Sequence, residues 1–204
     1  MAAAPRSPED RRAQILDVAV RLLETVPFDD LSMDQVAAEA GVSPPPPLLF
    51  HYFKNKQGFR NAVLEASASE LQRRMTPDAT LPVSGQLRAG VETFADAVIE
   101  HPTIYLAVMR MAGSGDERMR QIYRGMRHTF TRWIGASLAE FGVPTTPALE
   151  AAISGWQAFM EEVVLSWLDE PTMGRTDMID LCERAFYYLL PAAGVDVDAL
   201  DVTR

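Results

Sequence analysis

The chain of 204 residues contains one cysteine, Cys182, and three histidines, His51, His101 and His128. A single cysteine excludes an intrachain disulfide and a cysteine-based metal site. No two histidines have the spacing of metal ligands on one helix, so we expect no metal site. The sequence also lacks a nucleophile elbow, a phosphate-binding glycine loop and a dinucleotide fingerprint. We therefore expect neither an enzyme nor a bound cofactor.

Long hydrophobic runs are missing as well. No apolar run reaches the length that is needed to span a bilayer. Residues 1–6 lack the apolar core of a secretory signal. The composition, 48% hydrophobic and 23% charged, is ordinary for a globular protein. These features predict a cytoplasmic protein with no membrane partner.

Lysine is scarce, and the only two, Lys54 and Lys56, lie almost side by side in the sequence. The net charge of −9 is unevenly distributed. Residues 1–60 contain seven Lys and Arg against eight Asp and Glu, whereas residues 61–204 contain twelve against twenty. A local basic edge can contact phosphates beside an acidic body. The acidic body argues against broad, non-specific binding of nucleic acid.

Strand signals are weak throughout, and apolar residues recur instead with helical spacing. The first such stripe consists of Ile15, Val18, Ala19, Leu22 and Leu23. Pro27 should end this helix, and Ser32 with Gln35 forms the capping-box pattern of the next one. A turn at Gly41 then leads to a short segment that ends at Lys56. This layout predicts a helix-turn-helix, whose second short helix enters the major groove of DNA.

The rest of the chain predicts further helices separated by proline and glycine. Their approximate ranges are 56–75, a stripe at 91–99, 103–112, 116–141, 148–168 and 177–190. We therefore expect an all-α fold of about nine helices. Residues 1–60 should form a three-helix DNA-binding head, and residues 61–204 a second domain, a helical bundle.

A set of residues between positions 15 and 59 carries a family resemblance. It consists of Ile15, Ala19, Leu22, Leu31, Ser32, Met33, Val36, Ala37, Ala40, Gly41, Val42, Ser43, Phe50, His51, Tyr52, Phe53, Lys54, Asn55, Lys56 and Phe59. This segment closely resembles the N-terminal domain of the TetR (tetracycline-repressor-like) family of bacterial transcriptional regulators. The resemblance implies a ligand-responsive regulator, a repressor by expectation, that binds double-stranded operator DNA as a homodimer. The remaining chain resembles the family only in length and helical character.

The expected DNA contacts lie in the second helix of the motif and around it. They are Ser32, Met33, Ser43, Pro44, Pro45, Phe50, His51, Tyr52, Lys54 and Lys56. The lysines would contact phosphates, unless they are simply solvated surface residues. The backbone N–H groups at Ser32 and Met33 suit a phosphate, and His51 and Tyr52 can bond to phosphates or base edges.

Four consecutive prolines, Pro44–Pro47, depart from the family pattern, which has about two fewer residues in this segment. Each residue before a proline is pushed out of the α region. The run therefore favours a short polyproline II arm and predicts weaker or altered operator recognition. Alternatively, the extra residues bulge into solvent and leave the helix intact. The alternative function is a helical ligand-binding dimer whose DNA binding is impaired by this run.

Large apolar side chains in the body suit a ligand pocket. They are Tyr105, Met109, Phe130, Trp133, Trp156, Phe159 and Met160. For each of them taken singly, an ordinary core position is the better interpretation. The family resemblance implies that together they surround an unknown small apolar or amphipathic effector, which moves the connecting helix and releases DNA.

The last two predicted helices are apolar on more than one face, so they need burial on both sides. The residues expected at a dimer interface are Ile153, Trp156, Val164, Trp167, Ile179, Phe186 and Leu190. In the resembled family the two helices form a four-helix interface, and symmetric dimers are the commonest oligomers. The alternative is a large monomeric helical core.

Overall fold

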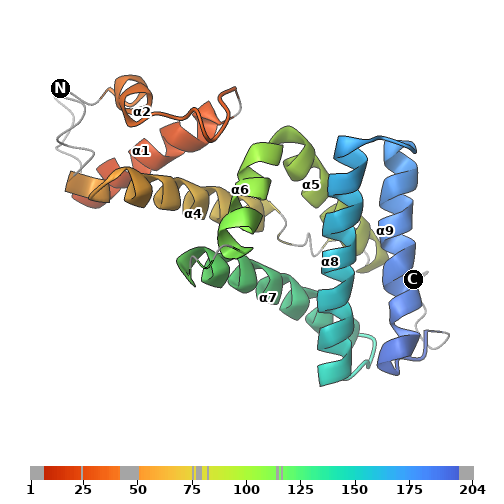
Figure 1. Cartoon of the computed structure of the whole chain (residues 1–204). Helices are drawn as coiled ribbons and strands as arrows, with labels where there is room; N and C mark the ends of the chain where they lie inside the picture. Colours follow the sequence, from red (N-terminus) through yellow and green to blue (C-terminus); the bar gives the residue numbers. More distant parts are fainter. Residues whose placement is uncertain are drawn as a thin grey trace. The chain divides into compact units, whose positions relative to one another are not determined.

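The computed structural model describes residues 7–23, 25–41, 51–74, 76, 80–81, 83–113, 115 and 117–197. Every regular element over these residues is a helix, as the sequence predicts (Figure 1). The helices are α1 (Pro8–Leu22), α2 (Met33–Glu39), α4 (Lys56–Arg74), α5 (Val83–Glu100), α6 (Pro102–Gly113), α7 (Glu117–Ala139), α8 (Pro147–Asp169), α9 (Arg175–Leu189) and the 3-10 helix η1 (Pro191–Ala193). Residues 51–53 are also helical. The predicted ends of α4 and of α6 to α9 agree to within about two residues, the usual spread for helix ends.

Contacts between Cα atoms divide the chain into two compact units. One comprises Met1–Glu70 and Glu100–Ile122, and the other comprises Leu71–Ile99 and Tyr123–Arg204. The first unit contains α1, α2, most of α4 and α6. The second contains nearly all of α5, most of α7, and all of α8 and α9. The long helices α4 and α7 therefore contribute residues to both units.

Local capping explains where the first two helices begin. α1 starts seven residues before the apolar stripe because the Ser7 hydroxyl accepts from the Asp10 N–H at 3.1 Å. The Asp10 carboxylate in turn accepts from the Ser7 N–H at 3.2 Å, which completes a capping box. At α2 the Ser32 hydroxyl accepts from the Gln35 N–H at 3.1 Å, as predicted. Among the described residues, the reciprocal half of that second box is missing.

The core of the helix-turn-helix joins α1 and α2 to the start of α4. Buried apolar residues come from all three helices, and α1 packs against α2. Phe53 and Phe59 are buried, and their rings meet edge to face with centroids 5.3 Å apart. This aromatic contact holds the end of the helical segment 51–53 against the first turn of α4.

In the second unit α8 and α9 lie side by side and antiparallel (Figure 1). The Trp156 indole N–H donates to the Cys182 carbonyl at 2.8 Å, and the Trp156 and Phe186 rings meet with centroids 5.1 Å apart. Burial raises the pKa of the Cys182 thiol to about 11. Trp156 and Phe186 therefore pack inside a single chain.

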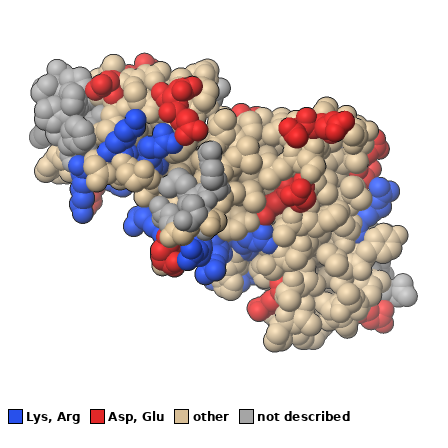
Figure 2. Space-filling model, in the orientation of Figure 1, with Lys and Arg blue, Asp and Glu red and all other residues tan. Residues whose placement is uncertain are grey.

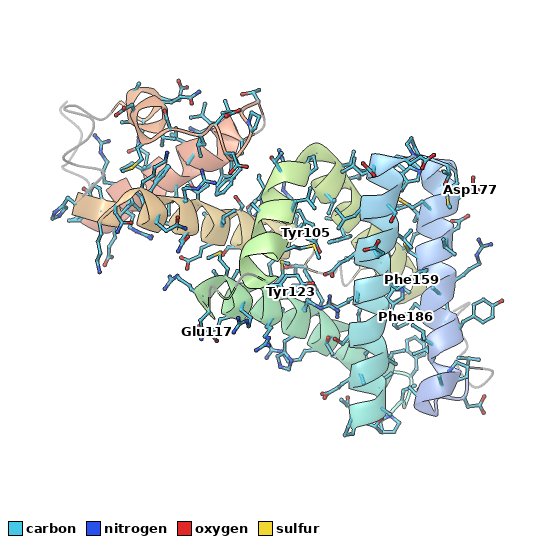
Figure 3. All side chains as sticks on the ribbon, in the orientation of Figure 1. Tyr105, Glu117, Tyr123, Phe159, Asp177 and Phe186 are labelled. Atoms are coloured by element: carbon cyan, nitrogen blue, oxygen red, sulfur yellow. The ribbon has the colours of Figure 1, made fainter. Side chains whose placement is uncertain are left out.

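A buried polar cluster joins α7 to α8. Glu161 accepts from the Arg127 guanidinium at 2.7 Å and from the Tyr123 hydroxyl at 2.7 Å. Tyr123, which is labelled in Figure 3, belongs to α7. The Arg127 side chain is 16% exposed and that of Glu161 is 7% exposed. Burial, followed by the bond to Glu161, raises the pKa of the Tyr123 phenol above its usual value. Because the cluster satisfies its own charges, it fixes how α7 and α8 meet.

Removing one partner of the Arg127–Glu161 pair should destabilise the chain strongly. The substitution Glu161→Ala leaves the guanidinium in a poorly solvated site and should lower the free energy of unfolding by about 3 kcal/mol. Replacing both residues, with Arg127→Met and Glu161→Leu, should recover most of that loss because no buried charge remains. Urea denaturation at one fixed protein concentration measures the free energy of unfolding of the parent chain, the single variant and the double variant. A double variant as unstable as the single one would contradict this account.

Candidate nucleic-acid interface

A tight turn links the helical segment 51–53 to α4. The Asn55 N–H donates to the Phe53 carbonyl at 2.8 Å, and Lys54 between them has φ 66°, in the left-handed region. Asn55 caps α4 by accepting from the Gly58 N–H at 2.7 Å. A Cβ atom at Gly58 would lie 2.2 Å from the Phe53 carbonyl oxygen, which is a prohibitive distance. Glycine at position 58 therefore lets the two helices approach this closely.

The turn exposes the residues that the sequence predicts as DNA contacts. Lys54, Lys56 and His51 are exposed, and Tyr52 is half-buried beside the His51 ring. Phe53 is buried in the head, as the family resemblance implies. A left-handed conformation costs an L-residue about 1 kcal/mol or more, so Lys54 occupies a strained position. Such strain is typical of positions that the surrounding structure holds in place for function.

Arg60 of α4 holds the turn between α1 and α2. Its guanidinium lies 4.2 Å from the centroid of the Phe28 ring, donates to the Phe28 carbonyl at 3.3 Å and pairs with Asp29 at 2.6 Å. Arg12 similarly lies over the Phe53 ring at 5.3 Å. Nothing in the sequence pattern predicts the Arg60 contacts, because their partners lie 31 and 32 positions away.

On one face of the molecule, basic and acidic side chains are interspersed. On the face shown in Figure 2, Lys and Arg atoms lie among Asp and Glu atoms and form no continuous basic surface. This agrees with the near balance of charge over residues 1–60. Phosphate binding by this head must therefore depend on a few well-placed cations.

Several predicted DNA contacts lie outside the described residues. They are Ser43, Pro44, Pro45 and Phe50, together with the rest of the run Pro44–Pro47. Ser32 is exposed and Met33 is half-buried at the start of α2. The Ser32 hydroxyl is already engaged in capping that helix.

The residues predicted to form a ligand pocket are divided between the two units. Tyr105 and Met109 belong to the first unit, and the others to the second. Trp156 and Met160 are buried, Phe159 is 38% exposed, and the Phe130 and Trp133 rings meet edge to face at 5.3 Å. None of these residues lines the cavity between α7 and α8 that is described below.

The residues predicted at a dimer interface are mostly buried within one chain. Six of them, Ile153, Trp156, Val164, Ile179, Phe186 and Leu190, are at most 4% exposed. Trp167 is half-buried and donates its indole N–H to the Met173 carbonyl at 2.7 Å. The helical period identifies buried positions, but it does not distinguish burial inside a chain from burial against a partner.

Comparison with known families identifies the class of this head. The family described as "Bacterial regulatory proteins, tetR family" matches residues 15–63. The family described as "Tetracyclin repressor-like, C-terminal domain" matches residues 83–189, more than half of the chain. The head is thus the DNA-binding domain of a helix-turn-helix transcriptional regulator.

Individual relatives agree with this class. The HTH-type transcriptional regulator EthR of Mycolicibacterium smegmatis is 32% identical over 163 residues, covering 72% of this chain and 70% of that protein. A TetR-family transcriptional regulator from Streptomyces coelicolor superposes with a TM-score of 0.75 at 25% identity, over 100% of this chain and 89% of that one. A transcriptional regulator from Rhodococcus sp. Rha1 shares the fold, with a TM-score of 0.68 at 20% identity over 94% and 100%.

The chain belongs to the TetR family of DNA-binding transcriptional regulators. This confirms the resemblance drawn from residues 15–59 and the expectation that the chain is not an enzyme, because regulators of this family act by binding DNA. None of the described helices is long and apolar enough to cross a bilayer.

Because Lys54 occupies a strained position, one substitution there should affect protein stability and the predicted DNA binding in different ways. Lys54→Gly should leave the free energy of unfolding unchanged or raise it by up to about 1 kcal/mol, because glycine adopts positive φ without strain. Loss of one phosphate contact should weaken DNA binding and reduce the slope of log K against log[salt] by about one. Lys56→Gln is the matched control for the stability measurement. It removes the same charge but relieves no strain, so its free energy of unfolding should not rise. Unchanged DNA affinity in Lys54→Gly would refute the predicted phosphate contact.

Proposed function

We propose that the protein is a repressor that binds operator DNA as a homodimer and releases it when an effector binds the body. Residues 1–60 would bind DNA, and residues 61–204 would bind the effector and form the dimer. The main support is the turn at Phe53–Gly58, which exposes Lys54 and Lys56 beside the helical segment 51–53. As a DNA-bound regulator, the protein would act in the bacterial cytoplasm.

The DNA contacts follow from what surrounds this turn. Lys54 and Lys56 bind phosphates and thereby set the register of the head on the duplex. His51 is exposed, and the half-buried Tyr52 ring packs between His51 and Phe53. Both side chains can bond to phosphates or base edges. Ser32, Met33, Ser43, Pro44, Pro45 and Phe50 complete the contacts predicted from the sequence.

Arg60 is the positioning residue of this head. Among the described residues, it forms no hydrogen bond or ion pair with a predicted DNA-binding residue. It joins α4 to the turn that precedes α2 through a cation–π contact, a hydrogen bond and an ion pair. A movement of α4 would therefore be passed to α2. An effector acts in this way only if it binds more tightly to one arrangement of the helices than to the other.

Dimerisation would use the outer faces of α8 and α9, not the buried residues named from the sequence. Between positions 151 and 162 of α8, the exposed residues are mostly small and uncharged: Ala151, Ser154, Gly155, Ala158, Phe159 and Glu162. On α9, Tyr188 is 81% exposed. The lower right of Figure 2 is largely uncharged over this part of the chain. Tyrosine and small residues on an uncharged helix face suit close packing against a second copy.

Selection of duplexes from a random library by the full chain tests DNA binding directly. We expect enrichment of a palindromic site with two half-sites, and a steep fall of affinity with salt. The alternative, impairment by the proline run, predicts no enrichment until Pro44–Pro47 is shortened to two prolines. If neither chain enriches any sequence, the proposed repressor function is wrong.

A pair of glycine substitutions tests the dimer surface. Gly155 on α8 and Gly125 on α7 are both helical, and an added Cβ would meet nothing within 4 Å at either position. Gly155→Gln and Gly125→Gln should therefore both fold, with helical propensity improved by about 0.5 kcal/mol or more. In sedimentation experiments, Gly155→Gln should dissociate the dimer, while Gly125→Gln should remain dimeric. A dimeric Gly155→Gln variant, or a monomeric parent chain, would contradict the proposed interface.

A further inference from the structure

A cavity lies between the C-terminal half of α7 and the N-terminal part of α8, entirely within the second unit. Its volume is about 190 Å³, and it is partly open to solvent. For comparison, an engineered apolar protein cavity of about 150 Å³ binds benzene. The space is therefore large enough for one aromatic ring or a branched apolar group.

The walls of the cavity favour an apolar body. Leu149 and Ile153 of α8 line it and are at most 1% exposed. The one buried polar side chain of the wall, Thr131, already donates to the Arg127 carbonyl at 3.1 Å and accepts from Gln157 at 2.9 Å. A ligand needs no polar atom at that depth, because these groups are satisfied.

Gly135 keeps the cavity open. It is buried near the C-terminal end of α7, within the helix, where glycine is less favourable than alanine. A Cβ added there would have the Thr145 hydroxyl as its nearest neighbour, at 3.9 Å. No close contact thus requires glycine at this position, and any larger side chain would occupy cavity space.

The mouth of the cavity carries one charge of each sign. Arg132 of α7 and Glu150 of α8 both line it, and both are exposed. Neither forms an ion pair with the other or with another described residue within 4.0 Å. Two opposite charges that are not neutralised at one mouth are complementary to a ligand that carries both charges.

We propose that this cavity binds a small zwitterion with an apolar body, of the chemical class of the aromatic α-amino acids. The ring lies against Leu149 and Ile153, the carboxylate pairs with Arg132 and the ammonium group pairs with Glu150. The site shares no residue with the set that the sequence singled out for an effector. The proposal goes beyond the proposed repressor function and holds whether or not such binding alters affinity for DNA.

Three matched probes test the charge requirement on the full chain by calorimetric titration at pH 7. L-phenylalanine carries both charges, 3-phenylpropionate only the carboxylate, and phenethylamine only the ammonium group. A charge-assisted bond at a partly exposed mouth should favour L-phenylalanine by about tenfold over each analogue. Equal affinity for all three probes, or no saturable binding of L-phenylalanine at millimolar concentration, would overturn the proposal.

Substitutions locate the site. Arg132→Gln should abolish the preference for L-phenylalanine over phenethylamine, and Glu150→Gln its preference over 3-phenylpropionate. Gly135→Leu should fill the cavity and block all three probes, while Gly125→Leu on the same helix leaves binding intact. Circular dichroism verifies that each variant is folded. Retained probe binding in a folded Gly135→Leu chain would contradict the site. If the parent chain binds no probe and Gly135→Leu weakens its dimer, the proposal is also wrong, and the cavity is part of a subunit contact instead.

Discussion

The close approach of Gly58 to the Phe53 carbonyl is the constraint on which the DNA-binding head depends. Any side chain at position 58 would separate the segment 51–53 from α4. With that contact in place, Asn55 caps α4 and Lys54 is held in the left-handed region. The Phe53 and Phe59 rings then meet in the core of the head. One short stretch of backbone thus presents two lysines and anchors the helix that leads out of the head.

The same helix, α4, also organises the rest of the first unit. Arg60 ties it to the turn between α1 and α2, and Glu65 forms an ion pair with Arg118 at the start of α7. In the second unit, Trp156 and Phe186 pack between α8 and α9, whereas Phe159, Tyr188 and several small residues of α8 stay exposed. In the proposed dimer, the exposed faces of α8 and α9 would set the distance between two heads.

Much of this architecture can be predicted from local sequence. Helical periodicity, prolines and glycines locate most of the helices, and Ser32 caps α2 as its spacing with Gln35 indicates. The residues between positions 15 and 59 identify the family, because their order and spacing follow from the geometry of a helix-turn-helix. Local patterns suffice here because capping and turn formation involve residues only three or four positions apart.

The remainder depends on contacts between distant residues. The Arg60–Asp29 and Arg127–Glu161 pairs span 31 and 34 positions and have no local signature. Periodicity correctly indicated that Trp156 and Phe186 are buried, but it could not tell whether a partner chain buries them. The cavity beside Gly135 likewise results from how two helices cross. Side chains that lie far apart in the sequence decide these features, and only the folded structure brings them together.

The central claim is that two such heads, held apart by paired bodies, bind phosphates on one face of a duplex. Ethylation interference on a selected operator measures which phosphates each head needs. The account predicts two clusters of essential phosphates, related by a two-fold axis and separated by about one helical turn, or a multiple of it. A single cluster, or no phosphate whose ethylation blocks binding, would contradict it.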